Sequence, residues 1–363
     1  MALVLAAWSA LLLASTETST ASPDVEDFVR EALRAHPEVT MAKLQAQAAT
    51  KRIAPAGAWD DPTFSVRAQN LPYDPLSLNV TPMSGIQLRV SQRIPWPGKR
   101  ALAQDAARAG AAVARYDAEE LKNTLAAQVR NVFFDIHLAD ISKEVLRTNL
   151  TTFRRFIETA DTKYRVGKGL QQDVLRARVA RDKLQEQLLG VERSRASLVE
   201  RLRTLLTRSK PLRLPPLLRV PISTLKREIS DTVMVQQAER TRPLLQALIQ
   251  SIERSDKTAA VARKAALPDV DVSLSYTFRG DAGGLDPAQG ADFLSMGLSV
   301  GLPVFYGRKQ APLAEAALAD HLAAKATLRA ARWQIQGEIS SALTEIAHLE
   351  RQMSKYADDI IPT

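Results

Sequence analysis

Apolar residues alternate with polar or small ones along two segments in the second half of the chain, residues 269–278 and 293–302, with the single exception of Phe293. Serine, glycine, aspartate and threonine occupy the other alternate positions, and apolar residues stand between them. Period-two alternation predicts β-strands that place their apolar side chains on one face of a sheet. Shorter alternating stretches predict two further strands in the first half, over residues 62–69 and 85–94. The apolar positions of the second pair include Val270, Val272, Leu274, Tyr276, Met296, Leu298 and Val300, which would face lipid if the sheet crosses a membrane.

A sheet with one apolar face can line a soluble core, or it can cross a lipid bilayer as part of a closed barrel with a wet interior. The predicted strands of the second half have about nine residues each, the length that a tilted membrane strand needs. Four strands in one chain cannot close a barrel, and lipid does not tolerate open sheet edges. If these strands lie in a membrane, several chains must therefore share one barrel.

Long helices are predicted for much of the remaining chain. None of the 19 prolines falls within residues 98–210 or 313–361, and a proline in a helix interior costs about 3 kcal/mol. Apolar residues recur there every three or four positions, which is typical of an amphipathic helix. The pattern breaks at the glycine-containing segment 164–169. We therefore expect an antiparallel helical hairpin over residues 98–210 and a single helix over residues 308–361.

The same order of elements occurs twice. Pro37 and Pro243 each begin an amphipathic helix, which is followed by two strands, a corner rich in proline and glycine, and a long helix. An offset of roughly 200 residues indicates a duplicated unit, because solenoid repeats are only about 20 to 50 residues long. We expect the first copy in residues 22–212 and a second copy, truncated in its helical hairpin, in residues 213–363. The corner residues are Pro95, Trp96, Pro97 and Gly98 in the first copy, and Pro303 and Gly307 in the second.

The amino terminus has the layout of a secretory signal peptide, which we expect over residues 1–21. Its uncharged apolar run of about 13 residues is short for a membrane span, and a stretch of small and polar residues follows it. A basic residue before the apolar run is missing, and a buried amino-terminal helix is the alternative. Because the sequence contains no cysteine after the apolar run, we expect no lipoprotein anchor.

Composition excludes several classes of protein. The lack of cysteine rules out disulfides, zinc ribbons, thiol nucleophiles and iron–sulfur clusters. The four histidines are scattered, and no catalytic triad, phosphate-binding loop or dinucleotide fingerprint occurs. We therefore assign no catalytic, cofactor-binding or metal-binding residues and predict no enzyme. The net charge of +9 suggests nucleic acid, but glutamates interleave the arginine clusters and aromatics make up only 5%. Solvated helix faces explain the charge better than a nucleic-acid partner.

Two motifs carry a resemblance to a known family. The corner Ile94-Pro95-Trp96-Pro97-Gly98-Lys99-Arg100 and the turn Tyr164-Arg165-Val166-Gly167-Lys168-Gly169 occur in an exported, duplicated chain with paired strands before long helices. Over essentially residues 24–363 the chain resembles the TolC family of outer-membrane efflux proteins. The corner motif looks most like the branch of this family that is paired with heavy-metal pumps.

The resemblance implies an α+β fold with long α-helical coiled-coil hairpins and four transmembrane β-strands per chain. Three chains would form a homotrimer with a twelve-stranded β-barrel in the outer membrane of a Gram-negative bacterium and a helical tunnel in the periplasm. The trimer would be a passive exit duct for substrates from an inner-membrane pump, such as an RND transporter, joined through a periplasmic adaptor. The alternative is an exported or cytosolic coiled-coil scaffold without channel activity.

By the same resemblance, the turn of the helical hairpin would be the tip that meets the adaptor. Its glycines would allow a turn with positive φ at low cost, and its charged residues would offer partners for hydrogen bonds. A turn that serves only to reverse the chain would explain the glycines but not Arg165. The expected adaptor-binding residues are Arg165, Val166, Gly167, Gly169 and Asp173.

Overall fold

The computed structural model describes residues 25–74, 77–79, 81–212, 214, 230–281, 283 and 290–356. The predicted signal peptide, residues 1–21, and the end of the predicted last helix lie outside this part of the chain. The chain divides into two compact units, Met1–Met41 with Leu121–Arg227 and Ala42–Glu120 with Glu228–Thr363.

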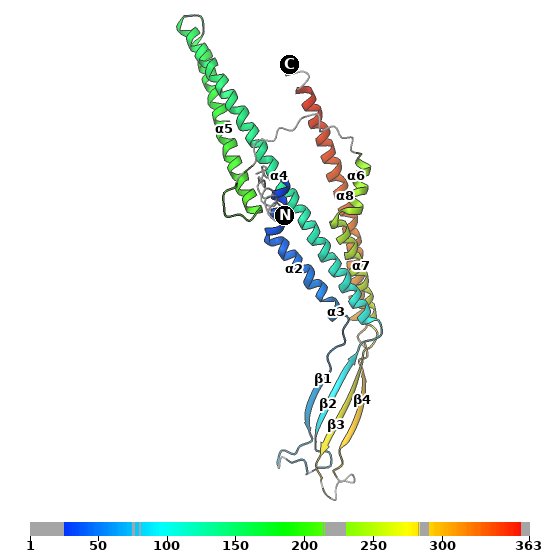
Figure 1. The fold of residues 1–363 in the computed structure, drawn as a ribbon. Coiled ribbons are helices and arrows are strands. Elements are labelled where there is room, and N and C mark those ends of the chain that lie inside the picture. Colours follow the sequence, from blue (N-terminus) through cyan, green and yellow to red (C-terminus); the bar gives the residue numbers. More distant parts are fainter. Residues whose placement is uncertain are drawn as a thin grey trace, which may run out of the picture. The chain divides into compact units, whose positions relative to one another are not determined.

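The first unit is built on a helical hairpin (Figure 1). Its arms are the distal part of α4 (Lys99–Arg165) and α5 (Gln171–Leu205), and α1 (Val25–Ala35) packs against them. Apolar side chains of all three helices form its core, since they recur at the spacing of a helix face. The largest of its fully buried side chains are Phe28, Val129, Phe133, Ile136, Leu202 and Leu206.

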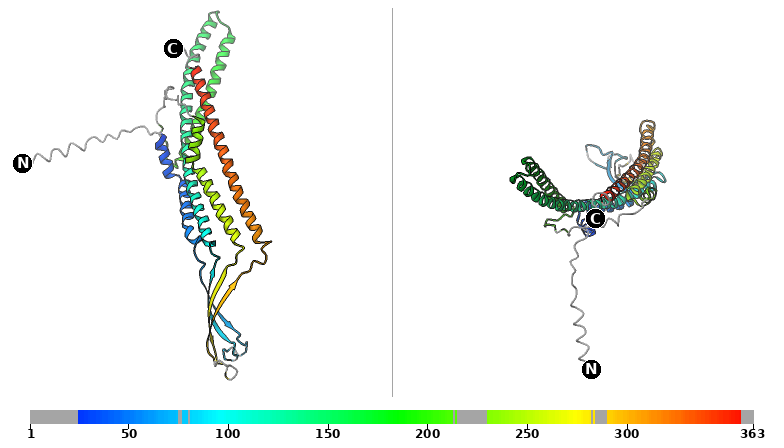
Figure 2. Two further views of the ribbon diagram at one scale, coloured as in Figure 1. Left: turned by 90° about the vertical axis from the view of Figure 1, so that its right-hand side faces the viewer. Right: turned by 90° about the horizontal axis from the view of Figure 1, so that it is seen from above.

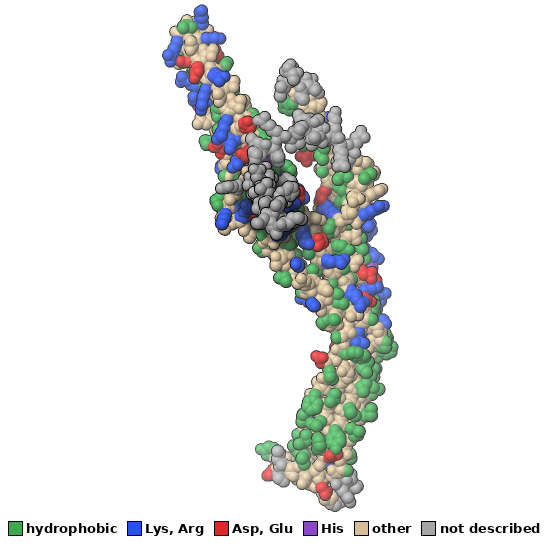
Figure 3. Space-filling view, viewed as in Figure 1, with side chains coloured by type: hydrophobic (Ala, Val, Ile, Leu, Met, Phe, Trp, Pro, Cys, Tyr) green, Lys and Arg blue, Asp and Glu red, His purple; other side chains and the backbone are tan. Residues whose placement is uncertain are grey.

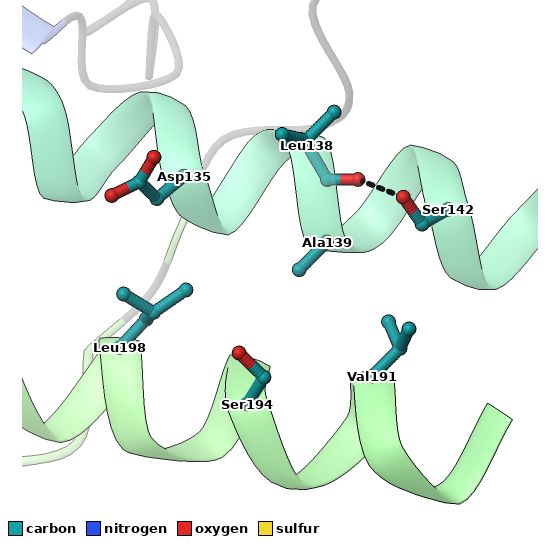
Figure 4. Close-up of a pocket in the computed structure, with 7 residues that line it drawn as sticks. All are labelled: Asp135, Leu138, Ala139, Ser142, Val191, Ser194 and Leu198. Carbon is teal, nitrogen blue, oxygen red and sulfur yellow. Dashed lines mark hydrogen bonds between the residues drawn. The ribbon is translucent and has the colours of Figure 1, made fainter. Parts of the chain in front are cut away.

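Ion pairs fix the register between the two arms of this hairpin. Arg195 of α5 donates to both carboxylate oxygens of Asp140 on α4, at 2.6 and 3.1 Å. Closer to the tip, Arg147 of α4 donates to Glu192 of α5 at 2.9 Å. A shallow groove of mixed polarity runs between the arms near the first pair (Figure 4). Its lining residues are Asp135, Leu138, Ala139, Ser142, Val191, Ser194 and Leu198.

The second unit contains most of α2 (Pro37–Lys51), α3 (Ile53–Ala56), the beginning of α4 and a helical group from the second half of the chain. In that group α7 (Pro243–Lys264) runs along α8 (Gln310–Lys355), which also contacts α6 (Asp231–Thr241) (Figure 2). Glu120 of α4 accepts a hydrogen bond from the backbone amide of Leu244, at 3.2 Å. The carboxylate therefore satisfies one of the unpaired amides in the first turn of α7.

The order of elements confirms the predicted duplication. Helices α1 and α6 both have 11 residues, and α2 and α7, which follow them, both begin at a proline. Each copy then contributes two strands and a long helix. The exact limits of the two copies, 22–212 and 213–363, stay predictions.

A single antiparallel sheet with the strand order β1-β2-β3-β4 completes the second unit (Figure 1). The strands are β1 (Thr63–Gln69), β2 (Gly85–Ile94), β3 (Val270–Arg279) and β4 (Phe293–Val300). The two copies meet in the sheet, because β2 of the first copy pairs with β3 of the second. Long helices with this small sheet confirm the predicted α+β class. Of the helices in the described ranges, none is both long enough and apolar enough to cross a membrane.

Candidate functional site

The register of the sheet gathers its apolar side chains on one face. In one row across the four strands, Phe64 lies opposite Val90, Val90 opposite Leu274, and Leu274 opposite Met296. All four side chains are exposed, and Met296 is 81% accessible. The seven residues of β3 and β4 predicted to face lipid share this face.

The opposite face is polar, and on β3 it is better covered than the apolar one. Ser273 and Ser275 of β3 are only 7% exposed. Nη2 of Arg89 donates to Oγ of Ser273 at 2.9 Å, and Nε2 of Gln87 donates to Oγ of Ser275 at 3.4 Å. A soluble sheet buries its apolar face, so this sheet has the reverse polarity.

Hydrophobic side chains cover much of the sheet surface in the space-filling view (Figure 3). The exposed apolar residues come from all four strands and form one continuous face through the register. Patches of this extent are rare on monomeric soluble proteins and indicate a contact with lipid or with another protein.

Asp269, which the sequence analysis did not single out, ties the first corner to β3. Its Oδ1 accepts a hydrogen bond from the backbone amide of Trp96 at 2.9 Å and one from Nζ of Lys99 at 2.7 Å. Its Oδ2 accepts from Nη2 of Arg93 at 3.0 Å. Burial would raise the pKa of the Asp269 carboxyl, but the hydrogen bonds from Lys99 and Trp96 and the charges of Lys99 and Arg93 outweigh it and lower the pKa.

The rest of the first corner is also held by the second copy. Gly98 has a φ of +85°, which a residue with a side chain adopts only with strain. Nζ of Lys264 on α7 donates to the carbonyl oxygen of Pro97 at 3.1 Å, and Nζ of Lys99 donates to that of Leu267 at 2.7 Å. These contacts hold the corner at which the chain passes from β2 into α4.

The second corner has a different geometry, although its sequence pattern is similar. The chain passes through successive turns, in which Tyr306 donates to the carbonyl of Pro303 at 3.1 Å and Lys309 to that of Phe305 at 3.0 Å. Gly307 does not have a positive φ. The two corners approach each other around a cavity of about 290 Å³ that is lined by Lys99 and Asp269 and also by Pro303.

The tip of the helical hairpin ends α4 with a Schellman motif. The amide of Lys168 donates to the carbonyl of Lys163 at 2.8 Å, and the amide of Gly167 donates to that of Tyr164 at 3.0 Å. Gly167 has a φ of +73°, as expected. The expectation of a positive φ is wrong for Gly169. A Cβ there would lie 3.2 Å from the backbone nitrogen of Tyr164, so Gly169 allows a close approach instead.

The charged residues of the tip are placed unequally. Nε of Arg165 lies 2.9 Å from Oδ2 of Asp161, one turn earlier on α4, while its side chain is 77% exposed. Asp173 lies in the first turn of α5, where a negative charge is favourable. Val166 is exposed beside them. The tip therefore presents apolar and charged groups to solvent, with Arg165 already held by a carboxylate of its own helix.

No group of histidine, aspartate and glutamate side chains within the described ranges could hold a metal ion. The role of Asp269 could not be predicted, because its hydrogen-bond partners are far from it in the sequence. Two arginines on the polar face of the sheet, Arg67 and Arg89, were also missed, although their place in the alternation of β1 and β2 was a usable signal.

Comparison with known proteins gives a family match over most of the chain. Residues 28–208 and 234–360 match the family described as outer membrane efflux protein. No curated protein matches the chain.

Solved structures of channels have the same fold. CusC, in a structure concerned with transmembrane channel formation, is 16% identical with a TM-score of 0.73, covering 93% of this chain and 79% of that chain. The outer membrane protein VceC from Vibrio cholerae is 18% identical with a TM-score of 0.73, covering 92% and 81%. The MtrE outer membrane channel of Neisseria gonorrhoeae, in its open state, is 16% identical with a TM-score of 0.68, covering 93% and 77%.

Proposed function

The chain belongs to the outer membrane efflux protein family and serves as an efflux exit duct, and we propose that it does so as a homotrimer that receives substrates from an inner-membrane pump. The family match removes the alternative of a coiled-coil scaffold without channel activity. Members of the family are passive channels. We therefore propose that the chain catalyses no reaction and that the pump supplies the energy for transport.

The reversed polarity of the sheet is the observation that carries this proposal. Its apolar side chains are exposed while Ser273 and Ser275 are covered, as in a barrel whose outer surface meets lipid and whose interior is wet. We propose that the apolar residues of β3 and β4 face the outer membrane of a Gram-negative bacterium. The helices would then extend into the periplasm.

The edges of the sheet support a trimer. Strands β1 and β4 each pair on one side only within the described chain, and lipid does not tolerate unpaired strand edges. If β4 of one chain pairs with β1 of the next, three chains give a twelve-stranded barrel. The same contact would bury the edges of every chain.

The tip of the helical hairpin is the proposed docking site for a periplasmic adaptor, which would join the duct to a pump such as an RND transporter. The exposed groups of Arg165, Val166 and Asp173 support this assignment. Gly167 and Gly169 would shape the turn that presents them. Membership of the heavy-metal branch stays a prediction from the corner motif.

Purification from membranes tests the proposed assembly. We expect that only detergent extracts the protein from the membrane and that the extracted species has the mass of three chains. Its mobility in gel electrophoresis should change on heating, because heating unfolds the β-structure. The double variant Ser65→Cys/Ser295→Cys places thiols on β1 and β4, roughly 14 Å apart within one chain because three inter-strand spacings separate them. A bifunctional thiol reagent too short to span this distance should therefore cross-link neighbouring chains of the double variant. The single variant Ser65→Cys should give no such cross-link. A soluble monomer or dimer without cross-links would contradict the proposal.

A further inference from the structure

Two arginines lie next to each other in the middle of the polar face of the sheet. Arg67 of β1 stands opposite Gln87 of β2, and Ser65 stands opposite Arg89. Arg67 and Arg89 are therefore diagonal neighbours on one face, at a separation that long side chains can reach across. Arg67 is exposed, and Arg89 is partly buried.

Neither arginine has a carboxylate partner among the residues that the structure describes. Arg89 donates instead to the hydroxyl of Ser273. The one acidic residue on this face of the strands is Asp271, which stands opposite Arg93 in the register, and Arg93 also donates to Asp269. The acidic groups therefore gather at the end of the sheet near the corner, and the middle of the face is positively charged.

Serine and threonine hydroxyls lie on the strand next to Arg89, and one of them, that of Ser273, accepts a hydrogen bond from its guanidinium. Ser273, Ser275 and Thr277 of β3 are on the same face as Arg89. Guanidinium groups stay protonated at any physiological pH and match the geometry of carboxylate, sulfonate and phosphate groups. Hydroxyl groups add neutral donors that an anion accepts. Rings of arginine in a pore attract anions and repel cations, because a wall of low dielectric constant concentrates the field.

We propose that the duct favours organic anions carrying carboxylate, sulfonate or phosphate groups, and that Arg67 and Arg89 determine this preference. The inference rests on the proposed function, since the polar face must line the interior of the barrel. In a trimer the two positions supply three pairs of guanidinium groups around one lumen. A divalent metal ion would pass such a wall more readily as an anionic complex than as the free cation.

The absence of cysteine from the chain allows a direct test with a single introduced thiol. Ser65→Cys places the thiol opposite Arg89 on the polar face, and Val66→Cys places one on the apolar face. The trimer, reconstituted in phospholipid nanodiscs, is treated with methanethiosulfonate reagents that carry either a sulfonate or a trimethylammonium group. The ratio of the two reaction rates, divided by the ratio for a free small thiol, measures the local potential.

For Ser65→Cys we expect a normalised ratio well above one in favour of the sulfonate. Adding Arg67→Gln and Arg89→Gln should lower it by about fivefold or more, because each removed charge changes the two rates in opposite directions. Arg67→Lys with Arg89→Lys should preserve the ratio. The matched control is Arg176→Gln with Arg193→Gln, which removes two exposed charges from α5 and should leave the ratio unchanged.

The outcomes separate this inference from the proposed function. A ratio near one, or a ratio that Arg67→Gln with Arg89→Gln does not lower, would overturn the anion preference while the channel assignment stands. If Val66→Cys reacts as fast as Ser65→Cys, the apolar face is in water, and both the membrane orientation and the anion preference fail. If Ser65→Cys does not react, the polar face is not in contact with water, and the membrane orientation and the anion preference both fail.

Discussion

The ammonium group of Lys99 lies 2.7 Å from Oδ1 of Asp269, and this ion pair joins the start of α4 in the first copy to the start of β3 in the second. Both side chains are largely covered. The same carboxylate receives the amide of Trp96 and the guanidinium of Arg93. Asp269 therefore holds three groups at the point where the strands of the first copy pass into its long helix.

Replacing Asp269 with Asn should destabilise this corner. The amide side chain loses the charge that binds Lys99 and Arg93, and hydrogen bonds to charged groups contribute about 1.5–3 kcal/mol each. We expect a loss of about 1.5–3 kcal/mol, the scale of one such hydrogen bond, and faster hydrogen–deuterium exchange in a peptide covering residues 94–100. Asp271→Asn is the control and should change stability by less than about 0.5 kcal/mol. Equal effects of the two substitutions would show that Asp269 has no special role.

His137 should make the helical hairpin less stable in mild acid. Its ring is 6% exposed and 4.5 Å from that of Phe133, and neither ring nitrogen has a hydrogen-bond partner. Burial lowers the pKa of His137 from 6.5; Asp140 raises it by a smaller amount, and Arg195 lowers it further. The unfolded chain therefore binds more protons just below pH 6.5, and stability falls as the pH drops through that range.

Thermal unfolding of the detergent-solubilised protein at pH 7.5 and pH 5 measures this effect. His137→Leu should reduce the difference between the two midpoints, because the group that takes up the proton is gone. His348→Leu, at an exposed position of α8, should leave the difference as in the parent protein. If His137→Leu keeps the full pH dependence, the buried imidazole does not cause it.

Substitutions at Gly167 test whether binding of the adaptor depends on the conformation of the turn at the tip. Pro cannot adopt the φ of +73° and would lose the hydrogen bond from the amide to Tyr164. Asn tolerates this conformation. We expect Gly167→Pro to reduce cross-linking to the adaptor severalfold and Gly167→Asn to retain most of it, while both variants stay trimeric. Unchanged cross-linking of Gly167→Pro would remove the tip assignment.

A charge on the apolar face should prevent insertion, whereas a charge on the polar face should not. Met296→Arg places a guanidinium where we propose lipid, at a cost of about 2–4 kcal/mol near the bilayer midplane. Ser295→Arg adds the same group one residue earlier, on the opposite face. Urea titration of folding into lipid vesicles compares the two. Equal destabilisation would argue against a lipid-facing surface.

Much of the architecture could be predicted because the physical constraints are local. Proline is excluded from helix interiors, so its absence over residues 98–210 indicated the hairpin of α4 and α5. Alternation indicated β3 and β4, because one face of each strand must differ from the other. The positive φ of Gly167 followed from the turn between two helices.

The features that were missed depend on contacts between distant parts of the chain. In the sequence, Asp269 is a single acidic residue that directly follows Pro268. Only folding brings Lys99 and Trp96 close to it. Gly169 has an ordinary φ, and its need for a small residue arises from the approach of the last turn of α4. Arg165 was expected to be available for a partner, but Asp161 is one turn away on the same helix. A pattern of residue types does not specify which of several charges will pair.

In the proposed duct, the apolar face of the sheet meets lipid while the polar face meets water. Nitroxide labels on single cysteines at Ser295, Met296, Leu298 and Ser299, in the protein reconstituted into phospholipid bilayers, test it directly. We expect labels at Met296 and Leu298 to collide mainly with oxygen, which concentrates in lipid. Labels at Ser295 and Ser299 should collide mainly with a water-soluble nickel chelate. Equal accessibility at all four positions, or the reverse pattern, would contradict a lipid-facing apolar surface.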